Sequence, residues 1–118
     1  MKNLFYFLIL VFMMVSCTSQ NCKSVPDTFS SYNEVLSTIN KTSFKIKDDV
    51  NTSKSSWIKK ANYYSCNEVT GFMIIKTKKQ NYIFENVPIT IWNDFKKSSS
   101  FGKFYNKKIR NKYKLYLN

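Results

Sequence analysis

The feature that most constrains this chain is an unbroken apolar run of twelve residues, Leu4 to Val15, which closely follows Lys2. A membrane-spanning helix needs about 20 apolar residues, so this run is too short to cross a bilayer. A basic start, a short apolar run and a small residue at its end are typical of an export signal that is removed. We therefore expect residues 1–16 to be a signal peptide and the rest of the chain to be exported.

The end of this run, Met14-Val15-Ser16-Cys17, resembles the lipobox of bacterial lipoproteins, in which the cysteine receives lipid and becomes the mature N-terminus. Each buried acyl CH₂ contributes about 0.8 kcal/mol to membrane binding. We expect Cys17 to be lipidated, with palmitate among its acyl chains. The protein would then be anchored in the cell envelope, at the outer membrane. The alternative is a secreted protein that is cut near Ser16 and keeps Cys17 as a spare thiol.

The mature chain has about a hundred residues, which is room for one small domain. Its charge is uneven. Residues 17–50 carry equal numbers of basic and acidic side chains, whereas residues 51–118 carry 14 basic against three acidic ones, a net of +11. This imbalance favours an anionic partner such as nucleic acid, lipid headgroups or acidic polysaccharide. The competing explanation is that the lysines only keep the surface soluble.

Lipid on Cys17 would leave Cys22 and Cys66 as an even pair in a compartment where disulfides form. They are either bridged, which would fasten the N-terminal arm to the basic region, or two free or buried thiols. The chain has no histidine and no Cys-x-x-Cys spacing. Zinc, haem and thioredoxin-like sites therefore lack their usual residues, and we expect neither a metal nor another cofactor.

Local patterns divide the mature chain. Residues 17–28 are polar and are predicted to form a tether. Residues 29–40 are predicted to form a short amphipathic helix, because apolar side chains recur there at helical spacing: Phe29, Tyr32, Leu36 and Ile39. The polar stretch 48–56 marks a change of composition. We therefore assign 29–50 to an N-terminal helix and linker, and 51–118 to the main domain.

Three runs in the main domain are rich in aromatic and β-branched residues, and they are predicted to be strands: 57–64, 72–77 and 81–84. Two helical faces follow, one with Ile91, Trp92 and Phe95 after Pro88, the other with Phe101, Phe104 or Tyr105, and Ile109. Gly102 is expected to mark a close backbone approach or a bend. The predicted fold is α+β: a small antiparallel three-stranded meander covered by one or two C-terminal helices and preceded by a short N-terminal helix.

The ordered set of residues between Ser55 and Tyr113 resembles the KTSC domain, a module found alone in bacterial proteins and at the C-terminus of some lysyl-tRNA synthetases. The resemblance rests on Ser55-Ser56-Trp57-Ile58, Tyr63, Tyr82-Ile83-Phe84, Val87-Pro88, and the segment from Ser100 to Arg110. Phe84 stands where the family has the second tyrosine of Tyr-x-Tyr, so a role for that hydroxyl does not carry over. The resemblance implies a fold and, through the synthetase fusion, suggests RNA binding.

Two binding hypotheses follow. The favoured one is a basic KTSC-like domain that lies against an anionic envelope component or a partner protein, with about 1 kcal/mol from each Lys or Arg at an anionic surface. The alternative is stacking on RNA or single-stranded DNA, with cations on the phosphates. Both use the same candidates: Lys76, Lys78, Tyr82, Phe84, Lys103, Lys107 and Arg110. For Tyr82 and Phe84 we favour a place in the core, because two aromatics spaced two apart on a strand usually pack inward.

A catalytic role is not expected. Besides lacking histidine, the main domain has only Glu68, Glu85 and Asp94 as carboxylates. Paired acid–base chemistry or a metal cluster is hard to assemble from these groups. We predict a non-catalytic lipoprotein without catalytic residues, in which the serines at 55–56 and 98–100 act in caps and turns.

Overall fold

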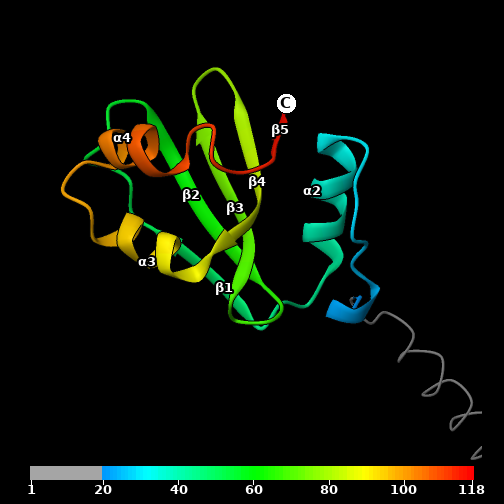
Figure 1. Cartoon of the computed structure of the whole chain (residues 1–118). Helices are drawn as coiled ribbons and strands as arrows, with labels where there is room; N and C mark the ends of the chain where they lie inside the picture. The colour runs from blue at the N-terminus through cyan, green and yellow to red at the C-terminus, as the bar shows by residue number, and fades with distance from the viewer. Residues whose placement is uncertain (1–19) are drawn as a thin grey trace, which may run out of the picture.

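The structure, a computed structural model, describes residues 20–118, so the predicted signal peptide and Cys17 lie outside the described residues. Its centre is one antiparallel sheet in which each strand pairs with its neighbour in sequence, in the order β1-β2-β3-β4-β5 (Figure 1). The strands are β1 (Ile46–Val50), β2 (Ile58–Ser65), β3 (Thr70–Thr77), β4 (Asn81–Pro88) and β5 (Leu115–Leu117).

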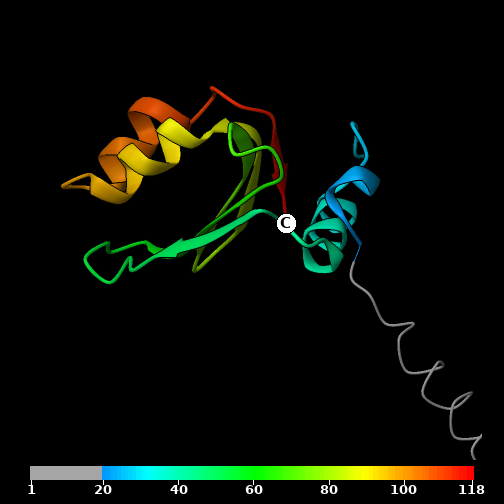
Figure 2. The same cartoon turned by 90° about the horizontal axis from the view of Figure 1, so that it is seen from below.

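Helices cover both faces of this sheet (Figure 2). They are η2 (Cys22–Ser24), α2 (Tyr32–Lys41), α3 (Ile89–Lys97), α4 (Phe101–Phe104) and the π-helical turn η3 (Tyr105–Ile109). We call the side covered by α3, α4 and η3 the α3/α4 face, and the opposite side the α2 face. Within residues 20–118, no helix is long and apolar enough to cross a membrane.

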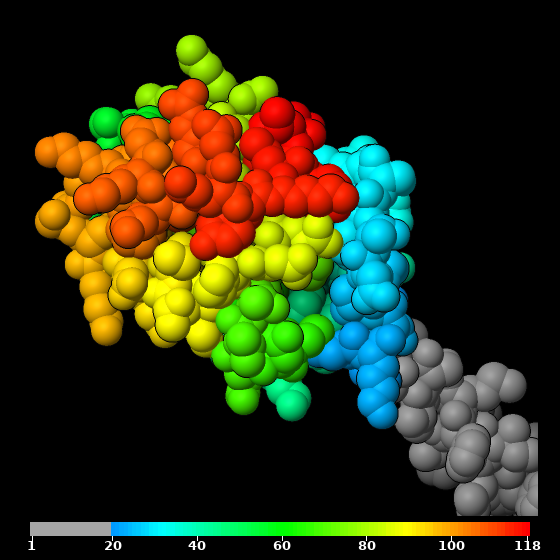
Figure 3. All heavy atoms as spheres, viewed as in Figure 1, coloured from blue at the N-terminus to red at the C-terminus, as the bar shows by residue number. Residues whose placement is uncertain are grey.

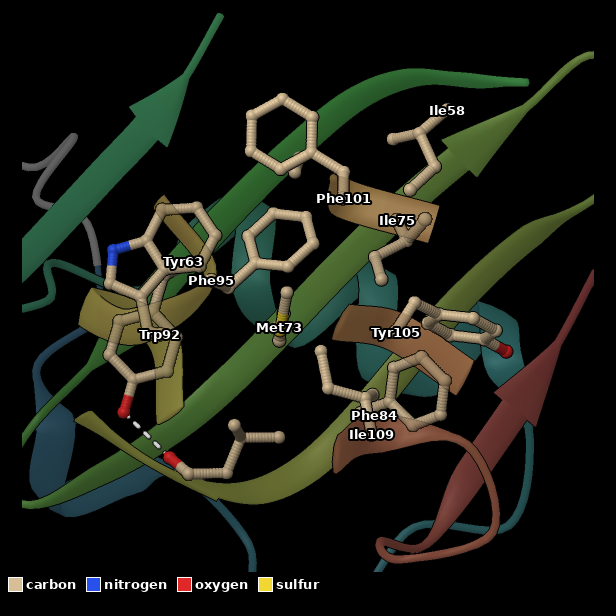
Figure 4. Close-up of a cluster of buried hydrophobic side chains, with 12 residues drawn as sticks. Ile58, Tyr63, Met73, Ile75, Phe84, Trp92, Phe95, Phe101, Tyr105 and Ile109 are labelled. Atoms are coloured by element: carbon tan, nitrogen blue, oxygen red, sulfur yellow. Dashed lines mark hydrogen bonds between the residues drawn. The ribbon is translucent and has the colours of Figure 1, made fainter. Parts of the chain in front are cut away.

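The α3/α4 face holds the larger core (Figure 4). Alternate residues of β2, β3 and β4 point into it, and the fully buried rings of Trp92 and Phe95 pack on them from α3. The Tyr63 ring stacks on Trp92 with 5.4 Å between centroids, and its hydroxyl donates to the Val87 carbonyl at 2.7 Å. Burial raises the pKa of Tyr63 to about 12, so this phenol stays neutral inside the core.

The α2 face is covered by one amphipathic helix. The Ser31 side chain caps α2 by accepting a hydrogen bond from the Glu34 amide, and the Glu34 carboxylate accepts one from the Ser30 amide. The Ser30 hydroxyl also donates to this carboxylate, and this bond, together with the one from the Ser30 amide, lowers the pKa of Glu34. Val35 and Ile39 of α2 are buried against the strands, in a cluster that also contains Phe72, Ile74, Ile83 and Tyr116.

The prediction of three strands was wrong, because the sheet has five. β1 lies in the segment assigned to a linker, and its sequence Ile-Lys-Asp-Asp-Val lacks a clean apolar alternation. It forms because β2 offers a free edge, and Asp48 fastens it to α3 by accepting hydrogen bonds from Trp92 Nε1 and Lys96 Nζ at 2.9 and 2.7 Å. β5 is three residues long and pairs with the other edge, β4.

The C-terminal segment completes the outer surface. Figure 3 shows it, in red, between the orange α4 and η3 region and the cyan α2. Its central residue, Tyr116, pairs with Ile83 and faces the α2 side, where its ring meets Phe29 edge-on at 6.2 Å. β5 therefore contributes Tyr116 to the core of the α2 face, while Leu115 and Leu117 stay exposed.

Candidate ligand-binding groove

Two adjoining hollows lie beside the turn between β3 and β4, and we call them together the aromatic groove. The first, of about 430 Å³, is lined by Trp57, Tyr82, Tyr105, Tyr113 and Arg110, with amide side chains around them. The second, of about 370 Å³, is lined by Lys78 and Lys79 and shares Trp57, Gln80 and Tyr82 with the first. The groove thus joins three half-buried aromatic rings and the buried Tyr105 to three cationic side chains.

Local sequence fixes the position of Trp57. The Ser55 hydroxyl accepts a hydrogen bond from the Ile58 amide at 3.0 Å, which sets the turn that begins β2. On the other side, a Cβ at Gly102 would lie 2.7 Å from Trp57 Nε1, so only glycine lets α4 come this close. The expectation of a close backbone approach at Gly102 is confirmed. Trp57 then meets the Tyr105 ring edge-on, with 5.4 Å between centroids.

Tyr82 and Phe84 point to the same side of β4 but have different roles. Phe84 is 1% exposed and packs against Tyr105 within the core (Figure 4), although it is also among the residues that line the first hollow. Burial confirms the packing interpretation for Phe84, whereas Tyr82, for which a place in the core was also favoured, is only half-buried. Tyr82 is half-buried, lines both hollows and donates from its hydroxyl to Gln80 Oε1 at 3.1 Å.

The π-helical turn η3 brings Arg110 to the groove. Its i→i−5 bond, from the Arg110 amide to the Tyr105 carbonyl at 2.8 Å, widens the backbone at this point, and Asn111 follows with a positive φ of 62°. Burial, with a smaller contribution from Tyr82, raises the pKa of Tyr105, while Arg110 opposes the shift. The Tyr105 phenol is therefore neutral at pH 7 and can donate a hydrogen bond.

A family model for the KTSC domain matches residues 54–113, just over half of the chain. The chain belongs to the KTSC family. A search of curated proteins finds no match to it. Within the KTSC match lie Trp57, Tyr82, Tyr105, Arg110 and Tyr113, so the family segment itself supplies the aromatic rings and the arginine of the groove.

The structure brings together only some of the predicted binding residues. Lys78, Tyr82 and Arg110 line the aromatic groove. Lys76, Lys103 and Lys107 belong to β3, α4 and η3, and none of them is among the residues that line it. Sequence reasoning missed Lys79, Trp57, Tyr105 and Tyr113 as groove residues. The abundance of aromatic residues in the KTSC segment could have suggested an aromatic site. The spacing of these residues along the chain does not indicate which rings stay accessible to a ligand.

The N-terminal arm is fastened to the far end of the KTSC sheet. Cys22 and Cys66 form a disulfide with 5.6 Å between Cα atoms, so the structure has the bridged alternative of the two that the sequence left open. Gln20 pairs with the chain after α2, donating to the Lys41 carbonyl at 2.7 Å and accepting from the Ser43 amide at 2.8 Å. The segment predicted as a tether is thus held against the fold from Gln20 onward.

Proposed function

We propose that this protein is a non-catalytic binding module, held at a membrane by lipid on Cys17, that binds an anionic envelope component through the aromatic groove. The observation that carries the proposal is that Arg110 lines one hollow, Lys78 and Lys79 line the adjoining one, and the two hollows share Trp57 and Tyr82. Cations supply attraction to phosphate or carboxylate groups, and the rings offer flat apolar surface to a sugar or a base.

The chain between Cys17 and the fold supports a particular orientation. Gln20 is already paired, and the chain from Cys17 to Gln20 can span at most about 10 Å, so a lipid on Cys17 would lie close to the folded domain. The disulfide sits where β2 ends, whereas Trp57 immediately precedes β2, and that eight-residue strand spans about 26 Å. A phosphorylated polysaccharide that extends away from the bilayer fits this placement better than a headgroup of the anchoring leaflet.

The chemistry of the groove supports binding rather than catalysis. No carboxylate, cysteine or histidine is among the residues that line either hollow. A general base or a metal ligand set would need such groups. Within residues 20–118, no group of three or more His, Cys, Asp or Glu side chains could hold a metal ion.

Nucleic acid is the second candidate, favoured by the half-buried rings of Trp57 and Tyr82 between two sets of cations. Stacking of one base on an aromatic ring contributes about 1–3 kcal/mol. An exported lipoprotein would meet nucleic acid only outside the cytoplasm, which is why we place this candidate second.

The test is a titration of the mature chain, carrying Cys17→Ser to keep it in solution, with Trp57 fluorescence as the signal. Lipopolysaccharide, a single-stranded oligonucleotide and neutral dextran are compared. We expect Arg110→Gln and Tyr82→Leu each to weaken binding of the preferred ligand at least about fivefold, or roughly 1 kcal/mol. Lys103→Gln makes an equal charge change at an exposed side chain of α4 and is the matched control. Equal losses of affinity for Arg110→Gln and Lys103→Gln would show that binding depends on overall charge and not on the groove.

Preference for the oligonucleotide over lipopolysaccharide would replace the envelope ligand by nucleic acid. The anchor is tested separately, by labelled palmitate incorporation into the full chain and into Cys17→Ala. Loss of label in the variant is expected. Equal labelling of both, or of neither, would contradict lipidation at Cys17.

A further inference from the structure

A third hollow, of about 470 Å³, lies on the α2 face, away from the aromatic groove. Its floor is formed by Tyr64, Phe72 and Glu85, which come from the neighbouring strands β2, β3 and β4, with Tyr64 directly opposite Phe72 in the register. Phe44 forms one side, and the disulfide with the segment Val25 to Asp27 forms the other. We call it the disulfide pocket.

Glu85 gives this pocket its character. Its side chain is only 8% exposed, and its one hydrogen bond from a described side chain is a long one, from the Tyr116 hydroxyl to Oε2 at 3.4 Å. The only ion pair among residues 20–118 is Lys96–Asp48, so Glu85 forms no ion pair there. The Tyr116 hydrogen bond and, to a smaller extent, the charge of Glu85 raise the pKa of Lys114. The Lys114 ammonium lies over the Tyr116 ring instead, 5.3 Å from its centroid. A mostly buried carboxylate that forms no direct ion pair is costly, so this group is suited to a cationic ligand.

The rest of the lining fits a cation as well. In a chain with a net charge of +12, this pocket is lined by Asp27 and Glu85 and by no lysine or arginine. Part of the remaining lining is aromatic: Phe44 lies 5.4 Å from Tyr64 and 6.3 Å from Phe72, at 49° and 77° between ring planes. Rings at steep angles beside a carboxylate are the surroundings in which ammonium groups bind, through cation–π attraction and a counter-charge.

We propose that the disulfide pocket binds an alkylammonium group, with Glu85 as its counter-ion and Phe44, Tyr64 and Phe72 as its aromatic walls. The Cys22–Cys66 bridge holds the Val25 to Asp27 segment over the strands, so the pocket depends on the oxidised state of the chain. This site is independent of the aromatic groove: it lies on the other face of the sheet and selects the opposite charge.

The test is an NMR titration of ¹⁵N-labelled protein with butylammonium chloride, up to about 50 mM, because a fragment of this size binds in the millimolar range. Butanol and butyrate are the neutral and anionic probes of equal length. We expect saturable shifts at Tyr64, Phe72 and Glu85 with butylammonium only. Equal binding of butanol, or no saturable shift at these residues, would overturn the proposal.

Glu85→Gln should weaken butylammonium binding at least tenfold, about 1.4 kcal/mol. Asp94→Asn makes the same charge change on the exposed side of α3 and should leave the binding unchanged. Equal effects of the two variants would overturn the proposal. Should Glu85→Gln fail to fold, Tyr64→Leu removes a half-buried wall instead and is expected to weaken binding. Ethanolamine and tetramethylammonium then distinguish a primary from a methylated amine. None of these measurements involves the aromatic groove, so their failure would leave the proposed function standing.

Discussion

The two faces of the sheet differ in where their cores come from. The α3/α4 face takes its buried residues from positions 58 to 109, all within the KTSC match. The α2 face combines Phe72, Ile74 and Ile83 of the KTSC strands with residues from outside the match: Phe29, Tyr32, Val35, Ile39 and Tyr116. The KTSC segment thus carries every buried residue of one core, against which Ile46 and Val50 of β1 also pack, and one apolar face that the two ends of this chain cover.

Truncation of a buried side chain on the α3/α4 face is expected to destabilise the whole domain. Phe95→Ala removes a fully buried ring in contact with Trp92 and Phe101, and we expect a loss of about 3–5 kcal/mol. Both tryptophans lie on this face, so urea unfolding monitored by tryptophan fluorescence measures this loss of unfolding free energy directly. Lys97→Ala, on the exposed side of α3, is the control and should stay within about 0.5 kcal/mol. A Phe95→Ala loss as small as the control's would mean that this face is not the main core.

The disulfide should matter next, and mainly for the α2 face. Cys22→Ala/Cys66→Ala opens a link between residues 44 apart, and we expect a loss of about 2–4 kcal/mol, because the unfolded chain gains freedom. Hydrogen exchange of α2 amides should accelerate, while the tryptophan emission of the native state stays as it was. Reduced wild-type protein should behave like the variant. A shifted native emission would show that the two faces are coupled more tightly than the comparison implies.

A smaller change within α2 separates the faces further. Val35→Ala removes two buried methyl groups from the side chain that packs on the strands, at a cost of about 1–2 kcal/mol. We expect the free energy of opening, measured by amide hydrogen exchange, to fall by this amount in α2 and to change little at the Trp92 amide. Val69→Ala, an exposed position on the β2–β3 turn, is the matched substitution. Uniform acceleration across β2 to β4 would indicate a single cooperative unit in which α2 cannot open alone.

The smallest effect is expected at the link between β1, which lies outside the KTSC match, and α3. Asp48 and Lys96 are each about one-third exposed, so Asp48→Asn should cost at most about 1 kcal/mol. The Lys96 hydrogen bond holds the pKa of Asp48 below its usual value. The contribution of Asp48 is therefore complete above about pH 4 and is lost as the pH falls through the lowered pKa. Urea midpoints at pH 7 and about pH 3 should differ less in the variant than in the wild type. Equal differences in urea midpoint between the two pH values would show that Asp48 does not contribute to the loss of stability in acid.

Much of each local element could be predicted. The helix expected at 29–40 is α2, displaced by one to three residues at its ends, and the three predicted runs are the cores of β2, β3 and β4. The apolar face with Phe101, Tyr105 and Ile109 is buried, although η3 carries it with π-helical rather than regular geometry. These features follow from side-chain periodicity, which is a property of neighbouring residues.

The sequence by itself determined the KTSC family and the uneven charge, and its strand periodicity favoured burial of Phe84 but equally of Tyr82, which is only half-buried. Only the tertiary structure decided that Ile46–Val50 and Leu115–Leu117 are strands, that Cys22 meets Cys66, and that Trp57 and Arg110 share one groove. An edge strand exists because a partner offers its free backbone groups, not because its own residues alternate. A groove likewise exists where distant segments leave rings incompletely covered. Periodicity is read from neighbours in the chain, whereas pairing and exposure depend on residues far apart in it.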